Sequence, residues 1–530
     1  MSNGSLDALA LERALPMADT ITALIAAGAN DAPAIGAPDR PWMTYGGLRA
    51  QAAATGAALH AMGIGRGDRV AIVLANGPEM AAAFLCIAQT ATAAPLNPAY
   101  KQDEYAFYLS DLRAKALLVA GDYDGPALAA AADLGIGIVR LHHRPDDPAG
   151  AFTLSAEGEF GSADTAAPAP DDVALILHTS GTTSRPKIVP LLQSNVAVSA
   201  GNIRDTLKLT AGDRSLNIMP LFHIHGLVAS LSASMAAGAS VWCAPGFNAL
   251  RFFAQMTQAD PTWVTAVPTM HQAILARAGR NADVIDNARL RFMRSSSASL
   301  PAPVMAELAG TFSVPVVEAY GMTEAAHQMC CNPIAPGAQR PGSVGPGAGP
   351  KVRIADEESD RLLDPAATGE VVISGPNVTP GYEGNPLANE KNFFNVDGER
   401  WFRTGDQGSF DADGYLYLTG RLKEIINRGG EKISPLEVDA ALLEIDGVAQ
   451  AVCFALPHPK LGEDIAAAIV LGDSAALDER AVKGRLADRL AAFKVPSKVL
   501  ILDEIPKGAT GKIQRIGLAE KLGLGVAAGS

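Results

Sequence analysis

Cysteine is scarce in this sequence, with only five in 530 residues. They are scattered along the chain, at Cys86, Cys243, Cys330, Cys331 and Cys453. An odd and dispersed set of this kind argues against a disulfide framework, and it lacks the paired spacing of a structural zinc site. A reducing compartment suits such a chain, so we expect the protein to be cytoplasmic.

Targeting signals and membrane-spanning runs are also lacking. The N-terminus, MSNGSLDALALERALP, has no basic region followed by an apolar stretch, and the C-terminus, VAAGS, is not a peroxisomal Ser-Lys-Leu signal. Residues 215–250 contain no Asp, Glu, Lys or Arg, but Pro220, Gly238 and Pro245 interrupt them. Because a membrane span needs about 20 mostly apolar residues in a row, we expect here a buried core helix with a flanking loop and strand.

Positive charge is in deficit as well. Lys and Arg number 43 against 56 Asp and Glu, which gives a formal net charge of -13. A nucleic-acid partner is not expected, because proteins that bind nucleic acids present a basic face. A small anionic ligand remains compatible with this composition, since a few basic residues focused in a cleft dominate the local field.

Strands and helices alternate along the first part of the chain. Residues 69–96 predict a strand, a turn, a long apolar helix and a second strand, and residues 116–120 predict a further strand. The segments 215–244, 260–280 and 290–320 continue this rhythm. Such alternation is typical of α/β layers built on a parallel sheet. A chain of this length is too long for one core, so we expect about three or four packed units.

The residue pattern of the sequence changes after about residue 340. The turn-rich stretch PGSVGPGAGP and two short expected strands, 370–374 and 415–419, indicate a smaller β-rich unit. From Gly420 onward the pattern predicts an α+β unit of roughly 110 residues, long enough to fold alone. Its expected helices are 435–444 and about 479–490, and its expected strands are 449–456, 465–470 and 498–502.

A polar loop rich in hydroxyls follows the apolar run 173–177. The stretch HTSGTTSRPK supplies six groups suited to a phosphate: Thr179, Ser180, Gly181, Thr182, Thr183 and Lys187. The hydroxyls can donate to phosphate oxygens, the glycine lets backbone N–H groups come close, and the lysine adds charge. Pro186 and Ile188 flank the lysine where a Walker A loop has glycine and a hydroxyl, which excludes a P-loop NTPase. A polar surface turn is the alternative.

Two further stretches carry histidines, or a hydroxyl beside a carboxylate. PLFHIHG places His223 and His225 at an expected strand–helix junction, either in a pocket or as core histidines, and no third metal ligand stands nearby. AYGMTEAAHQM offers Thr323 and Glu324, a pair suited to Mg²⁺ bound to a nucleotide phosphate. The alternative for this pair is a helix N-terminus capped by the threonine.

Three more stretches lie toward the C-terminus. WFRTGDQGSF holds Asp406 between turn residues, where its carboxylate can accept ribose hydroxyls or simply form a Gly-Asp turn. GRLKEIINRGGEKISPLE combines a basic entry, a glycine pair and a helix start at Ser434-Pro435, and it also suits an interdomain linker. PKGATGKIQR predicts a mobile basic loop or a solvated charged tail.

The order of these motifs resembles that of the adenylate-forming superfamily. TSGTT with PK, YGMTE, TGD, GR with GGEKISP, and PK with TGK follow one another as in its acyl-CoA synthetases, over essentially the whole chain. HTSGTTSRPK, PLFHIHGL, SSSASL, EAAHQM and INRGGEKISP resemble the oxalate–CoA ligase branch. The resemblance implies a large N-terminal AMP-binding domain over residues 1–420, made of layered α/β subdomains and a β-rich subdomain. A hinge over 421–424 and a small mobile α+β domain over 425–530 would follow.

Enzymes of this superfamily run two half-reactions. A carboxylate and MgATP give acyl-AMP and diphosphate, and the thiol of coenzyme A then converts the acyl-AMP to acyl-CoA and AMP. The resemblance therefore implies ATP, Mg²⁺ and coenzyme A as ligands, together with a small carboxylic acid. Positive charge has to neutralise the α-phosphate as it becomes five-coordinate.

The resemblance also implies a role for each motif. The loop from Thr179 to Lys187 would hold the β- and γ-phosphates. The residues around the nucleotide would be Thr323 at the α-phosphate, Glu324 at Mg²⁺, Tyr320 against adenine, and Asp406 with Arg421 at the ribose. The C-terminal part would supply Lys512 between the reacting carboxylate and the α-phosphate, Lys423 at the hinge, and Gly429 and Gly430 along the pantetheine path.

The acid is expected to be oxalate, which is small and keeps a second negative charge. The donors for its short polar pocket would be His223, His225, Ser296, Ser297 and His327. A histidine beside a second carboxylate would have its protonated form favoured. Most relatives have glycine where this chain has Ser184 and Ile188, and Ser184 should make the loop somewhat stiffer. The resemblance implies that the oxalate branch shares the variant Ser184-Arg185.

Three other interpretations remain open. One is a CoA ligase for malonate, acetate or glycolate, another is a stand-alone adenylation enzyme that loads a carrier protein, and the third is a nucleotide-binding protein without catalysis. Intact Thr323, Glu324, Lys423 and Lys512 argue against the third. The sequence leaves the oligomeric state open.

Overall fold

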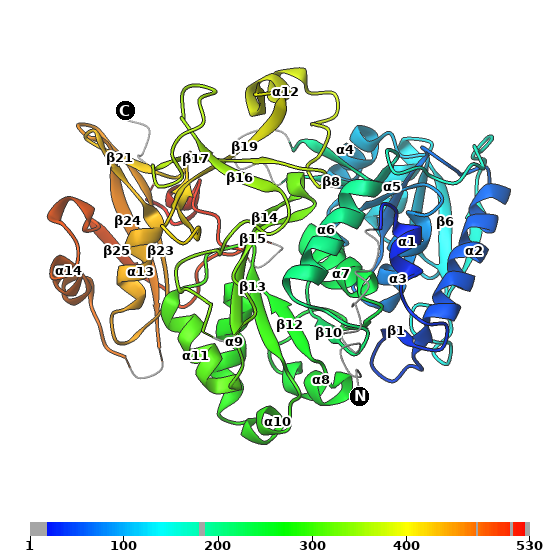
Figure 1. Cartoon of the computed structure of the whole chain (residues 1–530), viewed down its shortest axis with the longest axis horizontal. Helices are drawn as coiled ribbons and strands as arrows, with labels where there is room; N and C mark the ends of the chain where they lie inside the picture. Colours follow the sequence, from blue (N-terminus) through cyan, green and yellow to red (C-terminus); the bar gives the residue numbers. More distant parts are fainter. Residues whose placement is uncertain (1–17, 180–185, 336, 473–474, 509–511, 525–530) are drawn as a thin grey trace, which may run out of the picture.

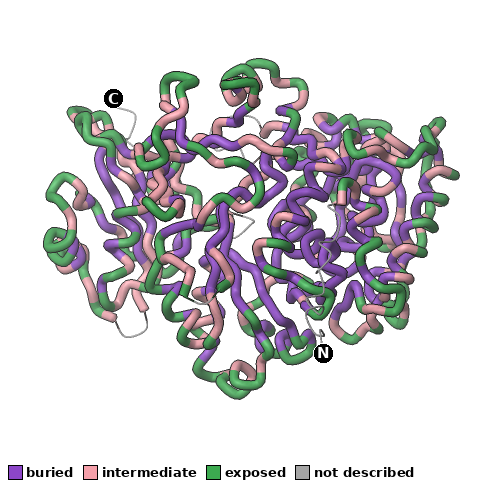
Figure 2. Tube along the Cα trace, viewed as in Figure 1, coloured by how far each residue is buried: buried purple, intermediate pink, exposed green. Residues whose placement is uncertain are grey.

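The computed structural model describes residues 18–179, 186–335, 337–472, 475–508 and 512–524. Within these ranges, four sheets organise the chain, and helices pack between and around them (Figure 1). The backbone is buried along the central strands and helices, whereas exposed positions gather in loops and outer helices (Figure 2). None of the described helices is long and apolar enough to cross a membrane.

The first sheet forms an α/β layer from the N-terminal third of the chain, drawn in blue and cyan in Figure 1. Its strands, in spatial order, are β7 (Thr153–Glu157), β6 (Gly137–His142), β5 (Ala116–Ala120), β3 (Arg69–Val73), β4 (Thr92–Pro95), β8 (Val173–His178) and β9 (Ile188–Leu192). The inner strands run parallel and are apolar on both faces, because helices cover both sides. The helices of this part are α1 (Ile21–Ile25), α2 (Tyr45–Ala61), α3 (Pro78–Ile87), α4 (Gln102–Leu112) and α5 (Pro126–Asp133).

The second sheet has eight strands and shares a core with the first. In spatial order they are β15 (His327–Cys331), β14 (Val316–Met322), β13 (Phe292–Ser296), β12 (Trp263–Ala266), β10 (Arg214–Asn217), β11 (Ser240–Cys243), β1 (Pro33–Gly36) and β2 (Met43–Thr44). The shared core contains α6 (Gln193–Thr206), the π-helix η1 (His225–Ser232) and α7 (Ala233–Ala236). The opposite face of the sheet carries α8 (Phe252–Ala259), α9 (Pro268–Ala278), α10 (Ala282–Asp286) and α11 (Ala302–Phe312).

Two smaller five-stranded sheets complete the chain. The β-rich unit contains β16 (Lys351–Ala355), β17 (Gly369–Ser374), β19 (Glu399–Phe410), β18 (Phe393–Val396) and β20 (Leu416–Arg421), with α12 (Pro386–Asn392) beside it. The C-terminal unit contains β22 (Glu431–Ile433), β21 (Ile426–Arg428), β24 (Gly462–Leu471), β23 (Val448–His458) and β25 (Lys498–Ile501). Its helices are α13 (Pro435–Leu443), α14 (Glu479–Ala487) and α15 (Leu518–Lys521), and it has hydrophobic clusters of its own.

The expected α/β layers, β-rich unit and C-terminal α+β unit are confirmed, and β5 has the expected bounds. The core helix expected within residues 215–250 is present, partly in π-helical form. The expectation that Asp406 lies between turn residues is wrong, because it lies inside the 12-residue strand β19. Gly405 adopts a φ of +74° there, which glycine tolerates, so the strand continues through a position that reads as a turn.

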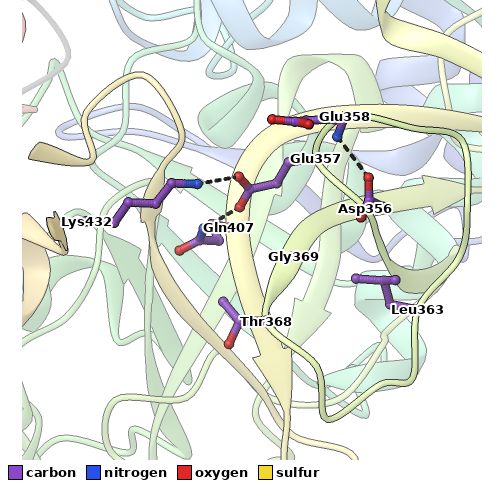
Figure 3. A pocket seen from close by; sticks show the side chains of 8 residues that line it. All are labelled: Asp356, Glu357, Glu358, Leu363, Thr368, Gly369, Gln407 and Lys432. Atoms are coloured by element: carbon purple, nitrogen blue, oxygen red, sulfur yellow. Dashed lines mark hydrogen bonds and ion pairs between the residues drawn. The ribbon is translucent and has the colours of Figure 1, made fainter. Parts of the chain in front are cut away.

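Contacts between side chains join the C-terminal unit to the rest of the chain, two of them far from the connection between the units. Lys432 Nζ lies 2.9 Å from Glu357 Oε2, and the side chain of Gln407 donates to the same carboxylate. Figure 3 shows these side chains at a pocket of about 370 Å³. At the second place, Gln272 Nε2 on α9 donates to the carbonyl of Ala449 at 3.2 Å. The chain passes from the third sheet to the fourth between Arg421 and Ile426.

Candidate active site

The candidate site begins where strands of both α/β sheets end. In open α/β sheets, ligands bind outside the carboxyl ends of the strands. β8 ends at His178, directly before the phosphate-loop motif. At the base of that loop the N–H of Thr179 donates to the carbonyl of Lys187 at 3.0 Å, and the N–H of Lys187 donates to Thr179 Oγ1 at 3.2 Å. Four expected phosphate contacts lie outside the described residues: Ser180, Gly181, Thr182 and Thr183.

Glu324 lies beside the base of this loop. β14 leads into the short 3₁₀ turn η2 (Thr323–Ala325), and the chain then enters β15, so the alternative of a helix N-terminus at Thr323 is wrong. Tyr382 donates its hydroxyl to Glu324 Oε1 at 2.7 Å, and Lys187 Nζ lies 4.2 Å from the centre of the Tyr382 ring. Tyr382 was missed by sequence reasoning, because GYEG at 381–384 reads only as a turn.

Burial opposes charge on both ionisable groups at this point. Desolvation raises the pKa of the Glu324 carboxyl above its usual value, and the Tyr382 hydrogen bond acts in the opposite direction. Desolvation lowers the pKa of the Lys187 ammonium, while the charge of Glu324 raises it and that of Lys423 lowers it. Glu324 and Lys423 therefore both act on the charge of Lys187.

Asp406 forms a second cluster with Tyr320 and Arg421. The hydroxyl of Tyr320 donates to Asp406 Oδ2 at 2.5 Å, and Arg421 Nε lies 3.2 Å from Oδ1. The antiparallel pairing of β19 with β20 sets Asp406 directly opposite Arg421. Burial raises the pKa of the Asp406 carboxyl, whereas Arg421 lowers it.

Lys512 comes to this cluster from the C-terminal unit. Burial and, to a smaller extent, the charge of Arg421 lower the pKa of its ammonium to about 8, while the charge of Asp406 opposes this shift. The charge of Lys512 also lowers the pKa of His223. The structure thus brings together Lys512, Asp406, Arg421 and a histidine, although they are spread over nearly 300 residues of sequence.

Three histidines gather next to Lys512. The centres of the His225 and His327 rings are 5.1 Å apart. The backbone N–H of His225 donates to His223 Nδ1 at 3.3 Å. His225 Nδ1 is 3.0 Å from Ser297 Oγ, and its Nε2 is 2.7 Å from Thr265 Oγ1. His327 Nδ1 is buried without a hydrogen-bond partner among the described residues.

Ser296 is the last residue of β13 and Ser297 follows it, and their hydroxyls have different surroundings. Ser296 Oγ donates to the carbonyl of Ala319 at 2.7 Å, so this hydroxyl proton is already engaged within the sheet. Ser297 is only partly buried and contacts His225. Ser297 and His327 both have positive φ, +77° and +103°, a conformation that is uncommon for non-glycine residues.

Protonation of a histidine beside a second carboxylate stays a prediction. Burial, together with the smaller effect of the charge of Lys512, lowers the pKa of His223 to about 3. Burial also lowers the pKa values of His225 and His327 well below their usual value, and neighbouring positive charges act in the same direction. The positive charge near the acid pocket comes instead from Lys512 and from Arg294, a buried residue that sequence reasoning missed. Its only sequence signal is a charge inside the apolar strand RFMRSS.

Lys423 and the glycine pair lie farther along the chain. Lys423 is exposed between β20 and β21. Gly429 and Gly430 form a two-residue turn between β21 and β22, with φ values of +62° and +99°. Two-residue hairpin turns with positive φ at both positions favour glycine. The pair is exposed, and the structure shows no contact between it and Lys512.

The residues present fit a nucleotide with a magnesium ion. Mg²⁺ is usually held by one or two carboxylates together with substrate phosphates and water. Glu324 suits this role, because its carboxylate keeps lone pairs beyond the one bonded by Tyr382. Among the described residues, no group of three or more His, Cys, Asp and Glu side chains forms a metal cage.

Comparison with known proteins places the chain in a family. The AMP-binding enzyme family matches residues 24–383, and the AMP-binding enzyme C-terminal domain matches residues 437–512. This chain belongs to the AMP-binding enzyme family. An oxalate–CoA ligase of Arabidopsis thaliana is 46% identical over 461 residues, covering 86% of this chain and 88% of the relative. An oxalate–CoA ligase of Saccharomyces cerevisiae is 42% identical over 478 residues, with 86% and 87% covered.

Solved structures of AMP-binding enzymes have the same fold. ATP-bound MatB from Rhodopseudomonas palustris matches with a TM-score of 0.84 at 29% identity, over 95% of this chain and 98% of that one. The anthranilate CoA ligase AuaEII in complex with anthranoyl-AMP matches with a TM-score of 0.82 at 25% identity, over 97% and 99%. The expected resemblance to AMP-forming acyl-CoA synthetases is confirmed, and ATP and coenzyme A are substrates of this family.

Proposed function

We propose that this enzyme is an oxalate–CoA ligase that converts oxalate, ATP and coenzyme A to oxalyl-CoA, AMP and diphosphate through an oxalyl-AMP intermediate. The observation that carries the proposal is the position of Lys512, beside both the Asp406–Arg421 cluster and a small pocket of histidine and serine side chains. The identity of 46% to an oxalate–CoA ligase over most of both chains supports the same substrate.

In the first half-reaction, a carboxylate oxygen of the acid attacks the α-phosphorus of ATP, and the bond from that phosphorus to diphosphate breaks. Two anions have to meet, so the site has to supply positive charge. Lys512 would stand between them, while Lys187 and the loop from Thr179 would hold the β- and γ-phosphates. Glu324 would hold Mg²⁺, which when bound helps neutralise the triphosphate. Thr323 would contact the α-phosphate.

The nucleotide would lie along the Asp406 cluster. Both oxygens of Asp406 are hydrogen-bonded or ion-paired, to Tyr320 and Arg421, so its carboxylate is already oriented before ribose arrives. A carboxylate held in place this way loses little freedom when it accepts the ribose hydroxyls. Tyr320, adjacent to it, would lie against adenine.

In the second half-reaction, the sulfur of coenzyme A attacks the acyl carbon, the bond from that carbon to the AMP oxygen breaks, and the thiol proton is released. We place the division between the two domains at the hinge 421–424. Residues 425–530 would turn about Lys423, withdrawing Lys512 and presenting Gly429 and Gly430 to the pantetheine arm. An exposed turn without side chains suits the passage of a thin chain.

The acid pocket supports a small polar substrate. Its walls offer His223, Ser297 and His327 rather than an apolar tunnel of the kind a fatty acid would need. His327 Nδ1, buried without a partner, is available for a ligand atom. A ligase for malonate, acetate or glycolate remains the second candidate, because these acids also fit a short polar pocket.

The mechanism can be tested with oxalate labelled with ¹⁸O in its carboxylates. An oxalyl-AMP intermediate transfers one labelled oxygen to AMP, because the carboxylate oxygen that attacked phosphorus leaves with the nucleotide. Each AMP formed should therefore carry one ¹⁸O atom, and oxalyl-CoA should appear in equal amount. Label in inorganic phosphate instead, with ADP as the other product, would contradict the proposal. Adenylate that accumulates but is not consumed by coenzyme A would favour the carrier-loading enzyme.

A further inference from the structure

Arg294 lies fully buried on β13, one layer behind the acid pocket. The parallel pairing of β12 with β13 sets Thr265 beside Arg294, and two pairs earlier, on the same face of the sheet, it sets Trp263 beside Phe292. These two aromatic rings stack at 5.6 Å. Along this face the sheet therefore changes from an aromatic pair to a polar pair within two residues, in the direction of the carboxyl ends where the site lies.

The charge of Arg294 has no carboxylate partner in the part of the chain that the structure describes. Its Nη1 donates to Thr265 Oγ1 at 3.2 Å, its Nη2 donates to Gln328 Oε1 at 3.3 Å, and its Nε is buried without a partner. Among the described residues, no carboxylate is one of the groups that act on its charge. A buried charge is normally paired, because leaving it without a counter-ion costs stability, so Arg294 suits a ligand that brings the opposite charge.

A chain of hydrogen bonds joins Arg294 to the pocket. Arginine can only donate, so Thr265 Oγ1 accepts from it and can give its own proton to His225 Nε2, 2.7 Å away. His225 is neutral beside this charge, and it then carries its proton on Nδ1 and donates to Ser297 Oγ at 3.0 Å. The hydroxyl proton of Ser297 is left free to donate into the pocket.

We infer that Arg294 determines specificity for a doubly charged acid. Its uncompensated buried charge, passed through Thr265 and His225 to the hydroxyl of Ser297, favours substrates that keep a second carboxylate after the first has reacted. Arg294 does not touch the substrate in this arrangement and acts as a positioning residue and as a source of field. This inference rests on the proposed ligase activity, and it assigns the preference for a dianion to one residue.

The test compares oxalate with oxamate, which has nearly the same shape but an amide in place of one carboxylate. The ratio of their kcat/KM values, measured from diphosphate release, is determined for the wild type, Arg294→Met and Arg294→Lys. In the wild type the ratio should be at least about 100 in favour of oxalate, and Arg294→Met should reduce it at least about tenfold. In Arg294→Lys burial lowers the pKa of the new ammonium, so the ratio should lie between those of the wild type and Arg294→Met and should rise as the pH is lowered.

Each result separates the two claims. The KM for ATP should change less than about threefold in every variant, which reports an intact nucleotide site. A ratio that Arg294→Met leaves unchanged would overturn the inference while oxalate remains the substrate. A wild type that prefers another dianion, with loss of that preference in Arg294→Met, would sustain the inference and overturn oxalate.

Two other outcomes are a variant that does not fold and a wild type without preference for oxalate. If Arg294→Met does not fold, Arg294→Gln removes the charge while keeping donors for Thr265 and Gln328, and the same loss of ratio is expected. If the wild type itself shows a ratio near one for oxalate over oxamate, that result decides the question without any variant. It would show that the pocket does not sense the second charge, and it would overturn both the inference and the choice of oxalate.

Discussion

Lys512 is the single residue on which the proposed adenylation step depends most. Its folded pKa, about 8, lies below its usual value of 10.5, so the ammonium is charged below about pH 8 and neutral above it. Because the charged form is the one that neutralises the reacting anions, kcat/KM for diphosphate release should fall about tenfold per pH unit above that value. A pH profile without this alkaline fall would contradict the role given to Lys512.

Substitution of the same residue separates the two half-reactions. Lys512→Met should lower the rate of acyl-AMP formation by about 10²–10³-fold, as expected when a charge at the transition state is lost. The reaction of preformed oxalyl-AMP with coenzyme A should stay within about threefold of the wild type, because Lys512 is withdrawn in that step. Rapid-quench measurements of each half-reaction would check this. Equal losses in both would place Lys512 in a structural role.

Substitution of His327 should affect binding of the acid and leave binding of ATP nearly unchanged. With Nδ1 unpartnered, His327 can bond the substrate carboxylate, so His327→Ala should raise the KM for oxalate by about 10–100-fold and that for ATP much less. The exposed histidine His142, which bonds Ser155 at the far edge of the first sheet, is a matched control, and His142→Ala should change neither constant. Equal effects of His327→Ala on both substrates, or no effect, would remove His327 from the pocket.

At the scale of elements, η1 sets the position of His225, its first residue. Gly226, one residue after its start, has room for no side chain, since a Cβ would lie 2.4 Å from the carbonyl oxygen of Pro220. Gly226→Ala should therefore lower the free energy of unfolding by about 1–3 kcal/mol and displace His225. In α11, a Cβ at Gly310 would meet nothing within 4 Å, so Gly310→Ala should leave stability equal or slightly higher. Urea unfolding of the two variants measures the difference, and equal losses would contradict this account of η1.

Helices and strands differ in how well the sequence predicts them. Apolar runs with turn residues at their ends predict β3, α3, β4 and β5 well, because a buried parallel strand needs such a run. The strand through Asp406 was missed because local turn chemistry was overridden by pairing with strands distant in sequence. Motif order predicts the nucleotide residues. It does not predict Tyr382, Thr265 or Arg294, whose roles arise only from contacts between separate strands.

At the scale of the whole molecule, the domain contacts suggest what holds Lys512 in place. The ion pair between Lys432 and Glu357 joins the C-terminal unit to the β-rich unit, and Lys432 is mostly exposed. Exposed pairs contribute about 0.2–1 kcal/mol, so Glu357→Gln should slow acyl-AMP formation by no more than about fivefold at low salt. The thiolation step should not slow, and the difference from wild type should vanish at high salt.

A matched ion pair inside the β-rich unit provides the control. Lys351 and Glu399 form an exposed pair of the same sheet that does not cross between domains. Glu399→Gln should leave both half-reactions unchanged. A similar slowing in this variant, or equal slowing of both half-reactions in Glu357→Gln, would show that the contact does not favour one domain arrangement.

Although the molecule has a net charge of -13, positive charge gathers at the candidate site. Lys187, Lys423, Arg421, Lys512 and Arg294 act on the site from four different parts of the chain. A field of this kind favours anionic substrates and sets apart acids that keep a second charge. The charge of the acid, more than its length, should therefore govern turnover.

The most direct test of the account is AMP formation with MgATP across oxalate, malonate, glycolate and acetate, each with and without coenzyme A. The account predicts that kcat/KM for oxalate exceeds that for glycolate and acetate by at least about 100-fold, because both lack the second carboxylate that the pocket is built to bond. Turnover with oxalate should also require coenzyme A. A monocarboxylic acid used as well as oxalate, or AMP formed at the same rate without coenzyme A, would contradict it.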